Sequence, residues 1–221
     1  MARMLAFTAV MWHEGLPVEA AGAPLGEGAA VMIMVHGRNA GPRNILDLAR
    51  RLECPSWTYL APTAANRTWY PLSFMAPIEQ NEPWLSSALG VLRDLVADVR
   101  ARGVPSARIV LLGFSQGACL SSEFAVRHPA RYGGLVLFSG GLVGPPGTTW
   151  SGTSGFGGTP VFLGCSDVDA HVPKTRVDES AAVFTRMGAE VTENIYPGMG
   201  HLVNDDEIAF ARGIMDRIHN P

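Results

Sequence analysis

The sequence lacks the basic runs that direct many proteins to polyanionic partners. Its 17 lysines and arginines stand against 20 acidic residues, which leaves a formal net charge of −3. Proteins that bind nucleic acid or anionic membranes neutralise phosphate groups with clusters of basic side chains. We therefore expect neither kind of partner, and a small, nearly neutral substrate fits this composition better.

Long apolar stretches are also missing, because no run approaches the roughly 18 residues that a membrane-spanning helix requires. The apolar residues 4–12 follow a single arginine, and residues 20–23 offer a weak cleavage site, so this segment could pass for a short signal peptide. The stretch is short, and His13 and Glu14 interrupt it at once. We therefore interpret residues 4–12 as a first strand.

Cysteine is scarce, since Cys54, Cys119 and Cys165 are an odd number and show no Cys-x-x-Cys spacing. This usage argues against a disulfide framework and against a zinc site, and it favours a reducing cytoplasm with the three thiols in the core. A His-Glu-x-x-His sequence is absent too. We expect no metal and no organic cofactor.

The 221 residues, 47% of them hydrophobic and 17% charged, are typical of one globular domain. A chain of this length removes most of its apolar surface from water without help, so a monomer or a homodimer is expected. Short apolar runs alternate with amphipathic stretches, a pattern typical of a parallel sheet covered by helices on both faces. We predict a single α/β domain with a mostly parallel central sheet.

The predicted strands cover residues 29–35, 57–60, 108–114, 134–138, 160–164 and 190–196, and the predicted helices cover residues 45–52, 81–102, 116–128, 174–187 and 205–219. The helix at 81–102 has the strongest apolar period, with Asn81 as its expected N-cap and Gly103 as its stop. Two long connections, 63–83 and 144–158, remain. Loops of such length are often functional.

Ser115 lies in Gly113-Phe114-Ser115-Gln116-Gly117, between a predicted buried strand and a predicted helix. This setting favours a Gly-x-Ser-x-Gly nucleophile over a glycine-rich turn whose serine caps a helix. The flanking glycines let strand and helix approach closely around a strained serine. Because a serine hydroxyl needs a base, and that base needs a carboxylate, we expect both partners further along the chain.

His201 is the candidate base, because it follows a predicted strand on a loop made pliable by Gly198 and Gly200. The candidate acids are Asp167 and Asp169, which follow another predicted strand, and only one of them can support the histidine. The order serine, aspartate, histidine along the chain is that of α/β-hydrolases.

These motifs together resemble the phospholipase/carboxylesterase family of α/β-hydrolases, which also contains the acyl-protein thioesterases. The resemblance extends from Val31 to about Ile208 and rests on His36-Gly37, the Gly-Phe-Ser-Gln-Gly elbow, an Asp-x-x-Val-Pro loop and a Gly-x-Gly-His turn. It implies the α/β-hydrolase fold. It also implies a triad of Ser115, His201 and Asp169, because the family's acid is the aspartate of Asp-x-x-Val-Pro.

The resemblance further implies an oxyanion hole formed by the backbone N–H groups of Arg38 and Gln116. The family often has glycine where this chain has Asn39, and asparagine tolerates the left-handed backbone better than most residues. We expect His36, at a strand end, to brace this loop as a structural imidazole. The Arg38 side chain is expected to be free for substrate or solvent.

The connection 63–83 carries aromatic and apolar side chains among prolines, as expected for a pocket wall beside a nucleophile. A loop tucked into the core is the alternative. The candidate substrate contacts are Trp69, Tyr70, Phe74 and Met75, and Trp150 and Phe156 of the connection 144–158 could complete a modest apolar cleft.

The residues therefore predict a cytoplasmic serine carboxylesterase that hydrolyses small-molecule esters of short to medium chain length. The same triad would serve an acyl-protein thioesterase or lysophospholipase-type hydrolase of long acyl chains. A third possibility, from another class, is a catalytically silent hydrolase fold used as a binding module.

Overall fold

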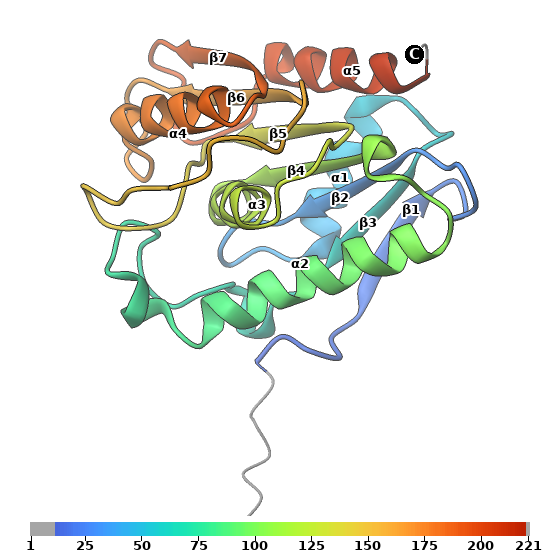
Figure 1. Cartoon of the computed structure of the whole chain (residues 1–221), viewed down its shortest axis with the longest axis horizontal. Coiled ribbons are helices and arrows are strands. Elements are labelled where there is room, and N and C mark those ends of the chain that lie inside the picture. Colours follow the sequence, from blue (N-terminus) through green and yellow to red (C-terminus); the bar gives the residue numbers. More distant parts are fainter. Residues whose placement is uncertain (1–11, 220–221) are drawn as a thin grey trace, which may run out of the picture.

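The structure, a computed structural model, describes residues 12–219, so the strand expected at residues 4–12 lies outside the described residues apart from Trp12. One sheet has the strand order β1-β3-β2-β4-β5-β6-β7 (Figure 1). Its strands are Val18–Gly22 (β1), Val31–Val35 (β2), Thr58–Pro62 (β3), Ile109–Phe114 (β4), Gly134–Phe138 (β5), Pro160–Ser166 (β6) and Glu190–Tyr196 (β7). Strands β2 to β7 run parallel, and β1 pairs antiparallel with β3 at one edge.

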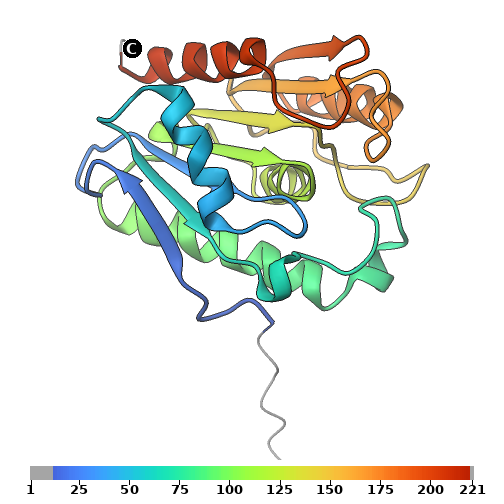
Figure 2. The same ribbon diagram turned by 180° about the vertical axis from the view of Figure 1, so that it is seen from behind.

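Helices cover both faces of this sheet. They are Pro42–Leu52 (α1), Trp84–Ala101 (α2), Gln116–Arg127 (α3), Lys174–Arg186 (α4) and Asp205–His219 (α5). Helices α2, α3 and α4 lie on one face, whereas α1 and α5 lie on the other (Figures 1 and 2). The prediction of a single α/β domain with a mostly parallel sheet is confirmed, and the fold is that of an α/β-hydrolase.

The central strands read as continuous apolar runs because both of their faces are buried. In β2, Val31, Ile33 and Val35 belong to the core under α2 to α4, while Met32 and Met34 belong to the core under α1 and α5. Truncating one such side chain to alanine typically costs about 2 to 5 kcal/mol. Two well-filled cores thus hold the carboxyl ends of the strands, where the chemistry-bearing loops begin.

Two features of the fold differ from the sequence prediction. The helix expected from Asn81 begins at Trp84, and Asn81 instead ends a short 3-10 turn. Its buried side chain accepts a hydrogen bond from the N–H of Leu72 and donates one to the carbonyl of Ser73, both at 2.9 Å. The strand β1 was not predicted, because an exposed edge strand with the sequence Val-Glu-Ala-Ala-Gly has little apolar pattern.

No helix within residues 12–219 is long and apolar enough to cross a bilayer. In the same part of the chain no group of three or more histidine, cysteine, aspartate or glutamate side chains could hold a metal ion. The cysteines Cys54, Cys119 and Cys165 are all free thiols, and Cys54 is only partly buried, in contrast to the core position expected for it.

Candidate active site

Ser115 occupies a sharp turn between the end of β4 and the start of α3. Its backbone has φ 55° and ψ −121°, in the left-handed half of conformational space that costs a residue with a side chain about 1 to 3 kcal/mol. A Cβ atom at Gly117 would collide with the carbonyl oxygen of Val35, and one at Gly113 would lie 2.5 Å from the backbone nitrogen of Ala118. The two glycines therefore allow the close packing that holds the serine in this conformation.

The structure brings Ser115, His201 and Asp169 into one hydrogen-bonded chain. His201 Nε2 lies 2.9 Å from Ser115 Oγ, and His201 Nδ1 lies 2.7 Å from Asp169 Oδ2. The other carboxylate oxygen of Asp169 accepts the backbone N–H groups of His171 at 2.8 Å and Val172 at 3.0 Å. These bonds fix the carboxylate, and the carboxylate in turn orients the imidazole toward the serine.

The surroundings keep Asp169 ionised although its side chain is fully buried. Burial by itself would raise the pKa of Asp169, but the hydrogen bond from His201 and the two backbone N–H groups outweigh it and lower the pKa below its usual value. The thiol of Cys165 lies 3.8 Å from Asp169 Oδ2, and burial raises the pKa of this thiol to about 12. Cys165 therefore stays neutral beside the carboxylate.

Asp167 has a different place from Asp169, although both follow β6. Its Oδ1 accepts the N–H of Gly198 at 2.7 Å, and the neighbouring Ser166 Oγ accepts the N–H of Gly200 at 3.0 Å. These two bonds attach the loop after β6 to the loop that carries His201. Of the two aspartates, only Asp169 contacts the imidazole, and Asp167 braces the loop behind it.

The loop after β2 contains three further residues of the predicted site, His36, Arg38 and Asn39. Asn39 has φ 62°, the left-handed conformation that was expected for it, and its N–H donates to the carbonyl of Arg67 at 2.8 Å. His36 Nδ1 donates to the carbonyl of Gly37 at 2.8 Å, and His36 Nε2 accepts the N–H of Ala64 at 3.2 Å. Burial lowers the pKa of His36, so a neutral imidazole braces this loop.

Within residues 12–219 the backbone N–H groups of Arg38 and Gln116 have no hydrogen-bond acceptor. Gln116 begins α3, and the first N–H groups of a helix have no partner within the helix. Both N–H groups are therefore free to donate to an oxygen atom that develops negative charge beside Ser115.

The side chains of Arg38 and Gln116 grip one segment of the connection between β3 and α2. The Arg38 guanidinium donates to the carbonyls of Tyr70 at 3.0 Å and Pro71 at 2.7 Å, and also to that of Leu72. Gln116 Nε2 donates to the same Tyr70 carbonyl at 2.8 Å. The expectation of a free Arg38 side chain is thus wrong, because three backbone carbonyls bind it.

A hollow of about 530 Å³ opens beside Ser115. The residues that line it are Gly37, Arg38, Asn39, Ala40, Tyr70, Pro71, Leu72, Ser73, Phe74, Phe114, Ser115, Gln116, Cys119, His171, Val172 and His201. Tyr70 and Phe74 therefore lie where the sequence placed them, whereas Trp69 and Met75 do not line the hollow. Trp69 is fully buried and donates from its indole nitrogen to the carbonyl of His36 at 2.8 Å.

The connection 144–158 does not line this hollow either, which corrects the expectation for Trp150 and Phe156. Trp150 donates to a carboxylate oxygen of the buried Glu123 at 3.3 Å. Phe156 is fully buried and packs edge-on against Phe184 of α4, with ring centroids 5.5 Å apart. Both aromatic side chains therefore fasten the loop to the helical layer.

A second hollow, of about 520 Å³, adjoins the first on the other side of Arg38 and His201. It shares with the first the segment 37–40, Phe114 and His201, and it adds Arg51, Arg67 and residues of α1. Ser115 does not line it. Residues 37–40, Phe114 and His201 therefore form the boundary between the two hollows.

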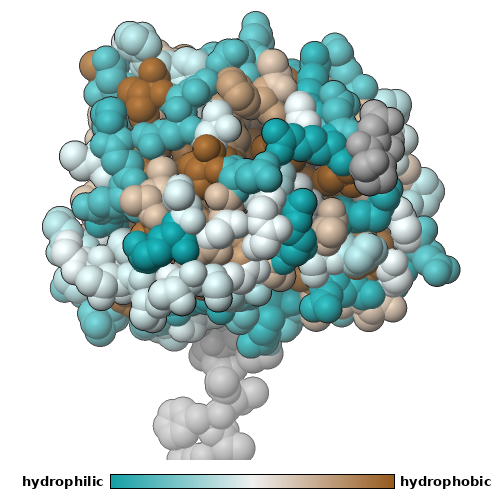
Figure 3. Space-filling model, turned by 45° about the horizontal axis from the view of Figure 1, so that its top comes forward, coloured by the Kyte–Doolittle hydropathy of each residue, from teal (hydrophilic) through white to brown (hydrophobic). Residues whose placement is uncertain are grey.

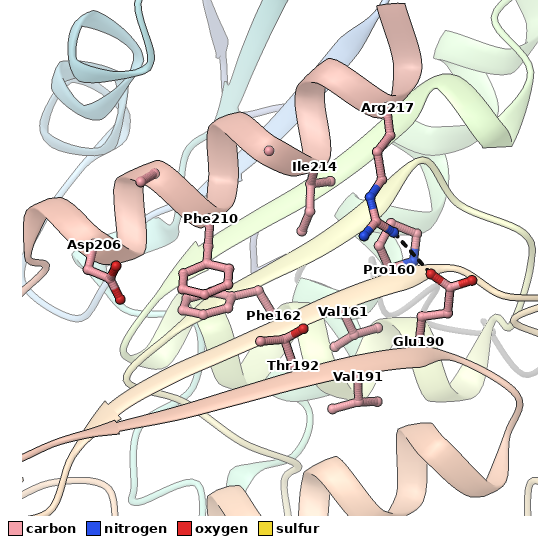
Figure 4. Close-up of a pocket in the computed structure, with 12 residues that line it drawn as sticks. Pro160, Val161, Phe162, Glu190, Val191, Thr192, Asp206, Phe210, Ile214 and Arg217 are labelled. Atoms are coloured by element: carbon pink, nitrogen blue, oxygen red, sulfur yellow. Dashed lines mark hydrogen bonds and ion pairs between the residues drawn. The ribbon is translucent and has the colours of Figure 1, made fainter. Parts of the chain in front are cut away.

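A third hollow, of about 540 Å³, lies at the far edge of the sheet between α5 and the strands β6 and β7 (Figure 4). Phe162 and Phe210 stack there with centroids 4.6 Å apart, and Arg217 pairs with Glu190 at 3.0 Å. The side of α5 and β7 shows apolar side chains only as separate patches among polar ones (Figure 3). Among the residues that the structure describes, no serine, cysteine or histidine lines this third hollow.

The chain is similar to known proteins over most of its length. A sequence model of the family described as phospholipase/carboxylesterase matches residues 24–218. The chain is 28% identical over 197 residues to acyl-protein thioesterase 1 of Eremothecium gossypii, which covers 72% of this chain and 82% of that protein.

Solved structures show the same similarity. A phospholipase/carboxylesterase from Dyadobacter fermentans superposes with a TM-score of 0.85 at 38% identity, over 90% of this chain and 96% of the other. The carboxylesterase of Bacillus cereus shares the fold, with a TM-score of 0.70 at 17% identity over 93% of this chain and 95% of the other.

Proposed function

Because the chain belongs to the phospholipase/carboxylesterase family, we propose that it is a serine carboxylesterase that hydrolyses carboxylic esters of short to medium chain length. The observation that carries this proposal is the continuous hydrogen-bonded chain from Ser115 through His201 to Asp169. A hydroxyl, an imidazole and a buried ionised carboxylate in this order are the parts that acyl transfer requires.

The reaction proceeds in two steps. Ser115 Oγ attacks the ester carbonyl carbon while His201 Nε2 takes the hydroxyl proton, and the imidazolium then gives that proton to the departing alcohol. Asp169 holds the Nδ1–H and stabilises the imidazolium, and the N–H groups of Arg38 and Gln116 bind the oxyanion. Losing one such donor typically costs about 3 to 4 kcal/mol of transition-state stabilisation. Water, activated by the same histidine, then hydrolyses the acyl-enzyme.

The lining of the hollow beside Ser115 supports short to medium acyl groups. Its wall contains the side chains of Leu72, Phe74 and Val172, which suit an apolar chain. Tyr70 and Cys119, which also line it, are almost completely buried and belong to the core under α2 to α4. An acyl chain that enters this hollow therefore meets the packed core.

A chain-length series tests the substrate range. We expect kcat/KM to be higher for p-nitrophenyl acetate and butyrate than for the palmitate ester. A strong preference for palmitate would instead favour the second candidate, a thioesterase or lysophospholipase-type hydrolase of long acyl chains. That candidate is supported by the similarity to the acyl-protein thioesterase of Eremothecium gossypii.

Labelling with a fluorophosphonate probe tests the serine mechanism itself. We expect the wild-type protein to be labelled and Ser115→Ala to remain unlabelled. A wild-type protein that fails to react would favour a hydrolase fold used only for binding, because this probe requires an activated serine.

The proposal extends to the compartment, which we expect to be the cytoplasm. The three free thiols of Cys54, Cys119 and Cys165 fit a reducing environment. Cell fractionation with an antibody to the protein checks this point, and recovery in a secreted fraction would contradict it.

A further inference from the structure

The second hollow contains an arginine whose charge is not compensated. Three arginines, Arg38, Arg51 and Arg67, line this hollow, and among the described residues no aspartate or glutamate does. Arg51 pairs with Asp205 at 2.8 Å, and the Arg38 guanidinium is bound to the carbonyls of residues 70–72. Arg67 forms no ion pair in the described part of the chain, and its one side-chain hydrogen bond joins Nε to the carbonyl of Ala40 at 3.4 Å.

The backbone at Arg67 is held in a conformation that a long side chain rarely adopts. Asn66 and Arg67 have φ values of 51° and 60°, both in the left-handed region that favours glycine and asparagine. The carbonyl of Arg67 accepts the N–H of Asn39, so a hydrogen bond joins the strained turn to the loop 37–40. Glycine would meet this backbone requirement at lower cost, and the presence of arginine indicates a use for its guanidinium.

The position of this hollow relative to the triad identifies the half of the substrate that it would hold. Ser115 and Gln116 line the first hollow and not the second, whereas His201 lines both. In acyl transfer the histidine gives its proton to the leaving group, which therefore departs along the imidazole. The second hollow is lined by His201 and not by Ser115, which suits the departing group, whereas the first hollow, lined by both, suits the acyl group.

We propose that the second hollow binds the leaving-group half of the ester and that Arg67 selects leaving groups with an anionic substituent, a carboxylate or a phosphate. This inference rests on the proposed esterase function and names the substrate class for it. A guanidinium suits both anions because its planar N–H donors match their oxygen atoms. A chain of negative net charge thus places an uncompensated positive charge, that of Arg67, beside the hollow proposed to capture such a substrate.

Three acetate esters that differ only in the para substituent of the phenol test the proposal. They are 4-acetoxybenzoate, 4-acetoxyphenyl phosphate and the neutral methyl 4-acetoxybenzoate, and each kcat/KM is divided by the rate constant of spontaneous hydrolysis. We expect the wild-type protein to favour an anionic ester over the neutral one by about 5- to 20-fold at low salt, a range between the weak effect of an exposed ion pair and the stronger effect of a hydrogen bond to a charged group. Added sodium chloride should reduce this ratio.

The variant Arg67→Asn removes the charge and suits the left-handed backbone, so it separates the guanidinium from the turn. We expect it to bring the ratio of anionic to neutral ester close to one, and Arg67→Lys to retain part of the preference. The matched control is Arg102→Asn at the end of α2, which should keep the wild-type ratio. Preference for the carboxylate or for the phosphate ester identifies the anion.

A wild-type ratio near one, or an unchanged ratio in Arg67→Asn, would overturn the inference. Hydrolysis of the neutral ester together with fluorophosphonate labelling would still support the esterase in that case. If the wild-type protein is not labelled and hydrolyses none of the three esters, the proposed function itself is wrong.

Discussion

The hollow beside Ser115 and the hollow at the α5 edge have nearly equal volumes, about 530 and 540 Å³, but they differ in the reactive groups that line them. At the edge, these charged groups already have partners, since Arg217 pairs with Glu190 and Asp206 accepts a hydrogen bond from Tyr196. Beside Ser115, a strained backbone, free N–H groups and an aligned imidazole remain available. The volume of a hollow is therefore a poor indication of a functional site, and the presence of unpaired reactive groups is a better one.

Helix α5 connects the two regions. Its first turn follows the loop that carries His201, and its later residues, Phe210, Ile214 and Arg217, form one wall of the edge hollow (Figure 4). Substitutions in the two hollows can thus be compared in one protein with the same fold. If only the hollow beside Ser115 is functional, a substitution there should lower activity, whereas its partner substitution at the edge hollow should leave activity unchanged.

The largest expected difference is between Ser115→Ala and Thr192→Val. Removing the nucleophile should lower kcat by about 10⁵- to 10⁶-fold. Thr192 lines the edge hollow and is exposed, so its substitution should leave kcat/KM for p-nitrophenyl butyrate within about twofold of wild type. A comparable loss in Thr192→Val would remove the distinction between the two hollows.

A second pair compares the two aspartates that follow β6. Asp169→Asn should lower kcat by about 10⁴-fold, because the amide no longer fixes the tautomer of His201 or stabilises its imidazolium. Asp167→Asn loses only a brace to the N–H of Gly198 and should cost less than about tenfold. Steady-state kinetics measures kcat for both variants. A larger loss of kcat in Asp167→Asn than in Asp169→Asn would assign the catalytic acid to Asp167 instead.

Glu207, in the first turn of α5, should make stability depend on pH. The residue is fully buried, its Oε1 has no hydrogen-bond partner within residues 12–219, and burial raises its pKa to about 7 from a usual value of 4.5. The native state therefore holds the proton more tightly than the unfolded state. The resulting stabilisation is fully present below about pH 4.5 and is lost as the pH rises through about 7.

Urea unfolding at pH 5 and pH 8 measures this effect. We expect Glu207→Gln, which stays neutral, to show a smaller difference in unfolding free energy between the two pH values than wild type, by at most about 3 kcal/mol. Glutamine retains the reciprocal cap with Asn204 that the glutamate makes. The control Glu190→Gln, in the exposed pair of the edge hollow, should shift that difference by well under about 1 kcal/mol. Identical pH dependence in Glu207→Gln and wild type would refute this assignment.

The smallest expected change in activity concerns a pair of arginines. Arg38→Ala removes the grip on the carbonyls of Tyr70 to Leu72 and loosens the N–H group that we assign to the oxyanion hole. We expect kcat to fall about tenfold with a smaller change in KM, and Arg38→Lys to restore only part of it, because an ammonium cannot reproduce the planar fork. Arg217→Ala should stay within about twofold of wild type in kcat. Equal effects of the two alanine variants would show that Arg38 has no positioning role.

The sequence predicted strands β2 to β7 and the segments that carry the candidate site because their patterns are local. Ser115 and Asp169 follow apolar runs, His201 follows a strand of mixed polarity, and the carboxyl ends of parallel strands meet at one edge of the sheet. Residue spacing alone left Asp167 and Asp169 as alternatives. Their separation came from the resemblance to a family, and the geometry then placed only Asp169 against the imidazole.

Other features had no local pattern to reveal them. The grip of Arg38 on Tyr70 and the contact of Asn39 with Arg67 connect positions about thirty residues apart. Trp69 and Phe156 were difficult to place for another reason. The local sequence around an aromatic residue on a long loop does not show whether its side chain lines a pocket or fills the core. Tertiary packing decided both, in favour of the core.

The carbonyl of Tyr70 receives hydrogen bonds from the side chains of both Arg38 and Gln116. One peptide group therefore sets the separation between two catalytic candidates that come from different strands of the sheet. The wall of the hollow beside Ser115 and the alignment of the backbone N–H groups of Arg38 and Gln116 cannot vary independently, since Arg38, Tyr70 and Gln116 determine both. A new connection grafted at 63–83 to admit larger substrates would have to provide an equivalent carbonyl acceptor for both side chains. Without it, the graft would accept larger substrates but lower kcat.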